Sequence, residues 1–342
     1  MDRRDFLKTT SAAAVAAGAA SASTAAASEA QAAAPPILYG IRQLTLVSSS
    51  SDLPGSGADR LARRIEMATD GRYRIELGKG ADADLTYGSA WRHAGLHRAF
   101  AVFAGLPFSQ GLDAAAQQIW LAAGGGAMLW DELAADFGFK PLVAGHTGAS
   151  AGVWATGRLE VPSDLAATGV QAEGLAGDVL RALGATPTTF APEDLRAALS
   201  DGRLQAAEWL GPLAAVAADL QPLAQRLYQP GFQRNGTLLS LDVAKPLWDG
   251  MSAADRAIFE ACAAQEYHLS LTDAAAHALI ASQVEAPSKW PVRLAWSSTL
   301  AEAFDQAAAE AVGRIAATDP ASRRIHDSYQ AFRRMLGEPA TV

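Results

Sequence analysis

The chain has 342 residues, of which 50% are hydrophobic and 19% charged, and this composition excludes intrinsic disorder, a collagen-like chain and a small disulfide-bonded scaffold. The formal net charge is -8, and no basic cluster follows the N-terminal segment, which argues against a nucleic acid partner. The single cysteine, Cys262, excludes an intramolecular disulfide. The length fits about two domains.

The first 34 residues have the features of an export signal. Arg3 and Arg4 precede Phe-Leu-Lys and an Ala-rich, weakly apolar stretch, which is the twin-arginine pattern. Small-x-small cleavage sites follow at 25–27 and 32–34. The alternative is an Ala-rich tail with no targeting role. We predict a twin-arginine signal peptide over 1–34 and a mature protein in the periplasm, without a later segment apolar enough to span a membrane.

Strands and helices then alternate along the chain, as hydrophobic spacing shows. Strands are predicted over 37–47, 72–77, 84–87, 140–144 and 237–243. Helices are predicted over 58–68, 113–122, 128–137, 212–220, 255–285 and 300–317. This order is typical of the α/β class. Nearly all charges on the long C-terminal helices are expected to lie on solvated faces.

One motif with possible catalytic chemistry is Gly148-Ala149-Ser150-Ala151-Gly152, which matches the G-x-S-x-G nucleophile elbow. In a hydrolase this serine lies between a strand and a helix. Here the residues after Ser150 are typical of a strand or loop, so a glycine-rich turn is the favoured interpretation. A periplasmic serine hydrolase using Ser150 remains an alternative.

Two further motifs could bind ions. His93 and His97 have the i, i+4 spacing of metal ligands on a helix, but Gly95 weakens that helix and surface histidines are favoured. The glycines at 124–126 could hold an anion at a helix N-terminus, but no phosphate-binding frame follows them. We predict that they form a helix–helix turn.

Several segments resemble one known family over about residues 41–335. They include GLAGDVLRALGATPTTFAPEDLRAALSDGRLQAAEWLGP at 174–212, AFAVFAGLPF, GGGAMLWDELAADFGFKPLVAGHTG and YQPGF. These are similar to the periplasmic solute-binding subunits of TRAP (tripartite ATP-independent periplasmic) transporters, and most of all to the subgroup that binds 2-oxo and 2-hydroxy acids.

The resemblance implies a two-lobed α/β periplasmic binding protein with long C-terminal helices. The expected N-terminal lobe comprises 37–148 plus about 234–275, and the second lobe 149–233 plus about 276–342, including a bracing helix. Hinge closure over a small carboxylate would present the closed form to membrane subunits. A homodimer is a further expectation.

The positions at which family members contact the ligand or its cation depart from the family pattern in this sequence. Gln171 stands where the family has an arginine that pairs with the carboxylate, and Ser150 stands where the subgroup has a glutamine. Glu208 and Trp209, which in the family help to hold a cation, remain. Arg234 replaces a second acid.

We therefore expect Arg234 to bind the carboxylate or to pair with Glu208, and no metal or other cofactor. A cation bridging the ligand at Glu208 and Trp209 is the disfavoured alternative. In a third interpretation, Arg234 is a solvated loop charge. The family also has a helix between its second and third strands, where residues 76–84 leave little room for one. Its loss is expected to open one cleft wall or to alter docking.

The predicted function is that of a TRAP solute-binding protein, without enzymatic activity, that captures a small organic anion and delivers it to membrane subunits. The candidate ligand-binding residues are Trp91, Ser150, Gln171, Glu208, Trp209, Phe232 and Arg234. For the aromatic members the alternative is ordinary core packing. The alternative function is a divergent sensor module that no longer binds 2-oxo acids.

Overall fold

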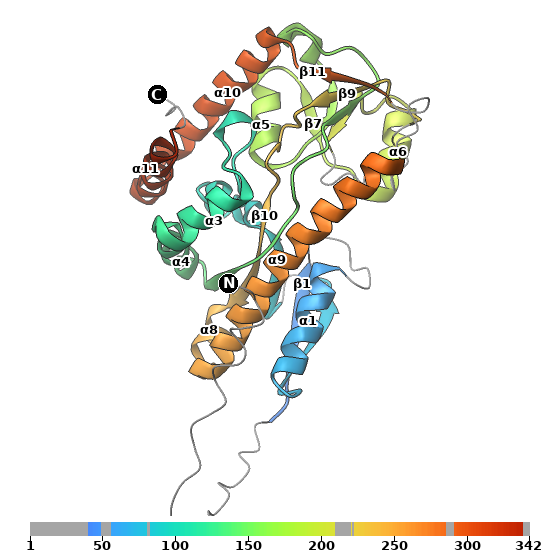
Figure 1. The fold of residues 1–342 in the computed structure, drawn as a ribbon. Helices are drawn as coiled ribbons and strands as arrows, with labels where there is room; N and C mark the ends of the chain where they lie inside the picture. Colours follow the sequence, from blue (N-terminus) through green and yellow to red (C-terminus); the bar gives the residue numbers. More distant parts are fainter. Residues whose placement is uncertain are drawn as a thin grey trace, which may run out of the picture. The chain divides into compact units, whose positions relative to one another are not determined.

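The protein contains two β-sheets (Figure 1). The structure, a computed structural model, describes residues 40–48, 56–80, 83–208, 220, 222–284 and 291–337. The first sheet has the order β2-β1-β3-β10-β4 and comprises β1 (Arg42–Ser48), β2 (Tyr73–Gly78), β3 (Leu85–Ser89), β4 (Phe139–His146) and β10 (Leu238–Ala244). The second has the order β11-β9-β5-β8-β6-β7 and comprises β5 (Val153–Ala155), β6 (Gly169–Gln171), β7 (Thr186–Thr188), β8 (Ala206–Glu208), β9 (Arg226–Gln229) and β11 (Val292–Ala295).

Helices surround both sheets. The α-helices are α1 (Gly57–Ala68), α2 (Phe100–Ala104), α3 (Ala114–Ala123), α4 (Gly126–Asp136), α5 (Gly174–Ala182), α6 (Pro192–Ser200), α8 (Lys245–Asp249), α9 (Ala253–Val284), α10 (Ser298–Ala316) and α11 (Pro320–Met335). Short 3₁₀ helices are η2 (Ala90–His93), η3 (Phe108–Gln110) and η4 (Pro162–Leu165). No helix in the described ranges is long and apolar enough to cross a membrane.

Most predicted elements are confirmed, within a few residues at their ends. The predicted strand at 37–47 is β1, although 37–39 lie outside the described residues. The predicted helix at 212–220 also lies outside them, apart from Leu220. The glycines at 124–126 form the predicted turn between α3 and α4, where Gly125 has a φ of 84°.

The short connection between β2 and β3 follows from the strand register. Both strands run parallel to β1, and Gly78 at the end of β2 is level with Val47. Leu85 at the start of β3 is level with Leu46, so the chain crosses the end of β1 without returning along the sheet. A parallel connection normally needs a dozen or more residues because the chain must return. The four described residues between β2 and β3 contain no helix.

Among the described residues, the part of the sheet beside this connection is covered on one face only. Its buried side chains are Leu44, Leu46, Tyr73, Ile75, Leu85 and Tyr87. The opposite face carries Gln43, Thr45, Arg74, Glu76 and Thr86, none of them buried. Parallel strands are normally buried on both faces. The polar residues therefore match a sheet face without a covering helix.

The C-terminal helices connect distant parts of the chain. Helix α9 packs against α1, β4 and β10, whereas α10 contacts α5 and η3, and α11 contacts α4 (Figure 1). Tyr329 of α11 donates a hydrogen bond from its hydroxyl to the Gln110 carbonyl and accepts one from the Leu112 N–H, both at 3.0 Å. The described residues from Gly40 onward form one compact unit. The predicted lobe boundaries stay a prediction.

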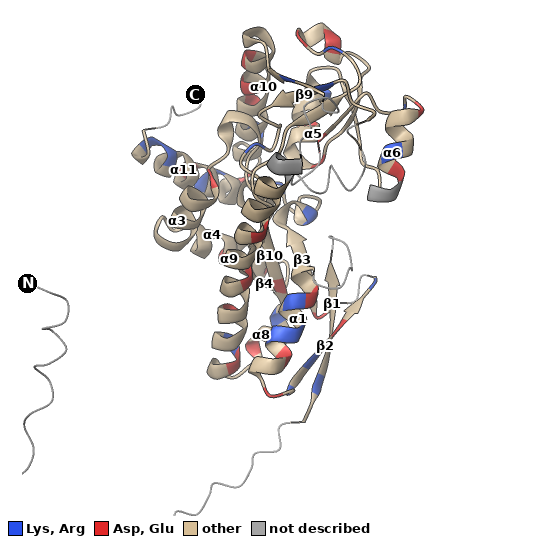
Figure 2. Cartoon of the chain, turned by 45° about the vertical axis from the view of Figure 1, so that its right-hand side comes forward, with Lys and Arg blue, Asp and Glu red and all other residues tan. Residues whose placement is uncertain are grey.

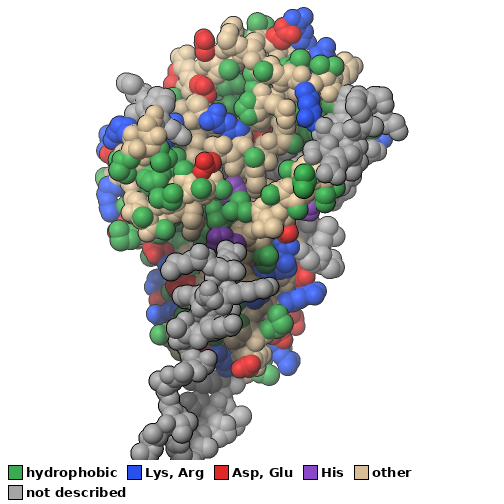
Figure 3. Space-filling view, in the orientation of Figure 1, with side chains coloured by type: hydrophobic (Ala, Val, Ile, Leu, Met, Phe, Trp, Pro, Cys, Tyr) green, Lys and Arg blue, Asp and Glu red, His purple; other side chains and the backbone are tan. Residues whose placement is uncertain are grey.

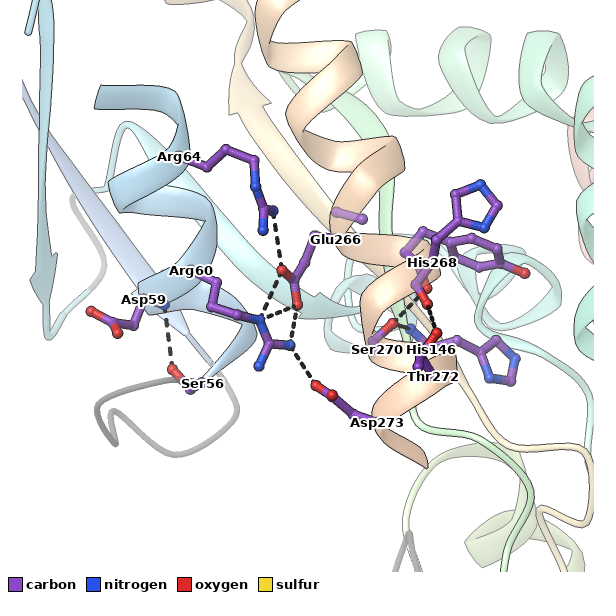
Figure 4. Close-up of polar contacts among 12 residues, drawn as sticks. Ser56, Asp59, Arg60, Arg64, His146, Glu266, His268, Ser270, Thr272 and Asp273 are labelled. Carbon is purple, nitrogen blue, oxygen red and sulfur yellow. Dashed lines mark hydrogen bonds and ion pairs between the residues drawn. The ribbon is translucent and has the colours of Figure 1, made fainter. Parts of the chain in front are cut away.

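Glu266 is an exception to the expectation that nearly all charges on the long C-terminal helices lie on solvated faces. Figure 2 shows basic residues on α1 facing acidic residues on α9. Glu266 of α9 is fully buried, and its carboxylate accepts hydrogen bonds from the Arg60 Nε at 3.0 and 3.1 Å and from Arg64 at 3.3 Å (Figure 4). Arg60 also pairs with Asp273 at 3.1 Å. A buried charge requires such partners.

The strands that cross between the two sheets meet at residues 146–148 and 236–238. The Thr147 N–H donates to the Thr237 carbonyl at 3.0 Å, and the Thr237 N–H donates to the Thr147 hydroxyl at 2.8 Å. Gly236 has a φ of 80°, and a Cβ there would overlap the carbonyl oxygen of Gly148. The close approach of the two backbones therefore requires glycine.

We expect Gly236→Ala to lower the free energy of unfolding by about 1–3 kcal/mol, because the added methyl group forces these backbones apart. Chemical denaturation of both proteins measures the loss. Gly71→Ala is the matched control, since Gly71 has a φ of 72° but open space around the Cβ position. Equal losses in the two variants would contradict the proposed overlap.

Candidate ligand-binding site

The turn at residues 230–234 encloses the carboxylate of Glu208, the last residue of β8. The backbone N–H of Gln233 donates to both carboxylate oxygens, at 3.0 and 3.1 Å. The Phe232 N–H and the Ser150 hydroxyl donate to the same group. A Cβ on Gly231 would overlap Glu208 and Ser150, so only glycine allows the turn to lie this close. Glu208 is therefore held by hydrogen-bond donors.

The electrostatic state of Glu208 reflects opposing effects. Burial raises the pKa of this carboxyl from 4.5 to about 7, although part of the residue is accessible. The hydrogen bonds from Ser150, Gln233 and Phe232 lower the pKa but do not offset the burial. Burial therefore favours the neutral form of this carboxyl more than water does.

Arg234 lies on the same turn but does not neutralise Glu208. Its backbone carbonyl accepts a hydrogen bond from the Ser150 N–H at 3.3 Å, which places the two residues side by side. The residue is exposed, and its guanidinium forms no ion pair or hydrogen bond with other described residues. The suggested salt bridge between Arg234 and Glu208 is absent, because the carboxylate faces the N–H groups of the turn.

Gln171 lies on the other face of the second sheet. In the parallel pairing of β6 and β8 it is level with Ala207, so strand alternation points Gln171 away from the side of Glu208. Gln171 is only 4% exposed, and its side-chain Oε1 accepts a hydrogen bond from the Phe190 N–H at 2.8 Å. The amide oxygen is thus committed to the protein backbone.

Phe232 belongs to a buried aromatic cluster behind the turn. It is 1% exposed and lies 5.6–5.8 Å, between ring centroids, from Phe108, Phe304 and Trp296. The Trp296 indole N–H donates to the Pro230 carbonyl at 2.6 Å, and the Phe108 N–H donates to the Phe232 carbonyl at 2.7 Å. In this structure core packing describes Phe232 better than an exposed ligand wall.

Trp91 lies in η2 and faces the N-terminal part of α5. Its ring contacts the Gly174 backbone, and the Arg98 guanidinium lies 5.2 Å from the ring centroid. Trp91 borders a surface pocket of about 370 Å³ with Glu173, Asp178, Arg181 and other residues of 172–189, but not with Ser150, Glu208 or Arg234. Of the candidate residues, the structure thus groups Ser150, Glu208, Phe232 and Arg234. Trp209 lies outside the described residues.

Sequence reasoning missed Gly231, Gln233 and Trp296, which shape the turn. The Pro-Gly pair at 230–231 was a usable signal, since such pairs mark tight turns. No comparable signal marked Trp296, because it reaches the turn from a segment more than 60 residues away. Its contribution depends on tertiary structure.

The other candidate motifs have structural roles. Ser150 precedes β5 and not a helix, its hydroxyl contacts the Gly152 N–H and Glu208, and no histidine in the described ranges hydrogen-bonds to it. This arrangement does not assemble a hydrolase triad. The residues expected to be surface histidines are mostly buried: His93 pairs with Asp242 at 2.6 Å, and His97 pairs with Asp319 at 3.1 Å. They bind different carboxylates and do not share a metal position.

A cation does not fit the donor set around Glu208. Hard cations such as calcium take several oxygen ligands. Within the part of the chain that the structure describes, the groups that face this carboxylate are two N–H groups and one hydroxyl donor, with the positively charged Arg234 next in the chain. Among the residues that the structure describes, no group of three or more His, Cys, Asp or Glu side chains could hold a metal ion.

Comparison with known proteins identifies the family. Residues 45–317 match the model of the bacterial extracellular solute-binding protein family 7, DctP. The chain belongs to this family. A monocarboxylate 2-oxoacid-binding periplasmic protein from Nostoc sp. is 26% identical over 298 residues, covering 82% of this chain and 80% of that protein. The predicted TRAP solute-binding class is thereby confirmed.

Solved DctP-like structures share the fold. A TRAP solute-binding protein from Bordetella bronchiseptica, a dimer with calcium and picolinate in one of its sites, has a TM-score of 0.80 and 22% identity, covering 87% of this chain and 93% of that one. A second, from Pseudoalteromonas atlantica with sodium and pyruvate, has a TM-score of 0.79 and 22% identity, covering 87% and 95%. The predicted two-lobed α/β class is confirmed.

Proposed function

We propose that this DctP-family protein captures a small monocarboxylate outside the cytoplasmic membrane and delivers it to TRAP membrane subunits. The observation that carries the proposal is the family match over 45–317, together with a relative described as binding 2-oxo monocarboxylates. The family consists of solute-binding proteins, so the role is binding without catalysis. Twin-arginine export by residues 1–34 would place the folded protein in the periplasm.

In this proposal Arg234 supplies the positive charge for the carboxylate. Its guanidinium has no partner among the described residues, and its backbone adjoins Ser150. A free guanidinium can form a bidentate pair with a carboxylate. Ser150, Glu208 and Phe232 support the turn from which Arg234 extends. Trp91, Gln171 and Trp209 remain candidates for contacts formed on closure, and a dimer like that of the Bordetella protein is a further candidate.

The experiment is a thermal-shift titration of the mature protein with 2-oxo, 2-hydroxy and unsubstituted monocarboxylates. A ligand stabilises the folded state by RT ln(1 + [L]/Kd), so the melting temperature should rise with concentration. We expect Arg234→Ala to weaken binding at least about tenfold, because a charge-assisted pair contributes about 1.5–3 kcal/mol. Arg74→Ala, an exposed arginine on β2, is the control. Unchanged affinity in Arg234→Ala would contradict the assigned role.

One observation favours the alternative of a sensor or orphan module. Gln171 provides no charge where the family has arginine, and its Oε1 already accepts the Phe190 N–H. A wild-type protein that none of the carboxylates stabilises would support that alternative. Stabilisation by any of them would favour capture and transport.

A further inference from the structure

The carboxylate of Glu208 has hydrogen-bond donors on the sides where a cation site needs oxygen ligands. Gln233 donates to both oxygens, and Phe232 and Ser150 donate to the same group. A calcium ion lies 2.3–2.6 Å from six to eight oxygens. N–H groups present positive hydrogens and cannot serve as such ligands. A cation that approached Glu208 from the side of the turn would have to displace these donors.

The backbone keeps these donors in place. Gly231 lies so close to Glu208 and Ser150 that it has no room for a Cβ, and the Pro230 carbonyl accepts the Trp296 indole N–H. Phe232, buried in the aromatic cluster, anchors the middle of the turn. The turn cannot withdraw from Glu208 without disturbing these contacts.

The charge at the neighbouring position also disfavours a cation. Arg234 follows the turn directly, and its backbone is hydrogen-bonded to that of Ser150. A guanidinium is always positive in proteins, so Arg234 adds a positive charge close to the turn and disfavours a second cation there. The donors of the turn and the charge of Arg234 thus both disfavour a cation at Glu208.

We infer that this protein binds its carboxylate ligand without a cation, and that it therefore does not require a ligand with a donor atom beside the carboxylate. The inference rests on the proposed function for its ligand class. Pyruvate and picolinate, held with sodium or calcium in the similar structures, both carry such a donor atom, which allows a molecule to chelate a cation. Without a cation, that atom loses its partner. The substrate class widens to plain short-chain monocarboxylates such as propionate.

The first arm of the test measures affinity by calorimetry. Pyruvate and propionate are titrated into the wild-type protein in EDTA and again in calcium chloride. We expect equal affinities in both buffers and a pyruvate-to-propionate ratio within about threefold, whereas a site built to engage the extra oxygen discriminates by orders of magnitude. A strong dependence on calcium, or a clear loss of propionate binding, would overturn the inference.

The second arm needs no organic ligand. The melting temperature of the wild-type protein should be the same in EDTA, calcium chloride and sodium chloride at matched ionic strength. The variant Ser150→Gln with Arg234→Glu returns oxygen ligands to both positions, and its melting temperature should rise with calcium. Ser150→Ala with Arg234→Ala is the matched control, which should not respond.

The two arms separate the possible failures. If no carboxylate binds but calcium leaves the wild-type melting temperature unchanged, the proposed function fails and the cation-free site stands. If calcium stabilises the wild-type protein, the inference fails whatever the ligand. A double variant that folds but ignores calcium would overturn the assignment of cation exclusion to Ser150 and Arg234.

Discussion

Replacing Glu266 with alanine is expected to lower the free energy of unfolding by about 3–5 kcal/mol, the usual cost of removing one partner from a buried ion pair. Glu266 is fully buried between α1 and α9 and is the shared partner of Arg60 and Arg64. Its loss removes this carboxylate from Arg64 and leaves Arg60, on the same helix, paired with Asp273 but no longer with Glu266 (Figure 4). The cost comes from this uncompensated charge more than from lost packing.

Urea denaturation followed by circular dichroism measures the effect. Glu260→Ala is the matched control, because Glu260 is exposed on the same helix. A substitution on the helix surface normally changes stability by less than about 0.5 kcal/mol. A loss below about 1 kcal/mol in Glu266→Ala would show that the network contributes little.

The second large effect concerns His146 at the crossing strands. Burial lowers the pKa of this imidazole from 6.5 to about 4, with a small opposing effect from Asp113. Its Nδ1 accepts the Gly148 N–H at 3.0 Å, which requires the neutral ring. Because the folded state disfavours the proton, the stabilisation is fully present above pH 6.5 and is lost as the pH falls toward 4. The loss amounts to about 3 kcal/mol.

We expect His146→Asn to remove this dependence while keeping an acceptor near the Gly148 N–H. The free energy of unfolding is measured between pH 4 and 7.5, and the difference between wild type and variant is compared at each pH. The difference is needed because Glu208, with its raised pKa, acts in the opposite direction in the wild-type protein: burial favours its neutral form, so its contribution is lost as the pH rises from 4.5 to 7. His268→Asn, at an exposed histidine, is the control.

A constant difference across this pH range would contradict the account of His146. The imidazole would then be charged in the folded state, or the crossing strands would open before it protonates. A difference that shrinks toward acid pH would support the account. The same pattern should be absent from His268→Asn.

The spacing of hydrophobic residues along the chain predicted the fold well where helices and strands are long and amphipathic. Helix α1 follows from Leu61 and Ile65, which point to one side and are fully buried, and β2 follows from the alternation of Tyr73 and Ile75. The short connection after β2 was also visible in the sequence. The spacing of hydrophobic residues did not show that Glu266, a charged residue in an Ala-rich helix, lies in the protein interior. That depends on α1, which is some 200 residues away in the chain.

The site was less predictable than the fold, because its geometry depends on residues from separate strands and turns. Ser150, Glu208 and Arg234 were named as candidates, and the structure places them together. Their relation differed from the suggested one, since Glu208 pairs with the turn backbone and not with Arg234. The side-chain sequence does not indicate which backbone N–H groups donate to Glu208. Only Gly231 indicated the close approach.

The chemical character of the surface agrees with capture of a small molecule. On the face shown in Figure 3, basic, acidic and hydrophobic side chains are interspersed, without a basic patch suited to nucleic acid. Membrane subunits remain the proposed macromolecular partner.

The most direct test of the central claim is a calorimetric titration of pyruvate into the mature wild-type protein in the presence of EDTA. The account predicts saturable binding at one site per chain, because Arg234 and the turn around Glu208 need no metal ion. Absence of heat in EDTA, followed by saturable binding once calcium is added, would contradict the account.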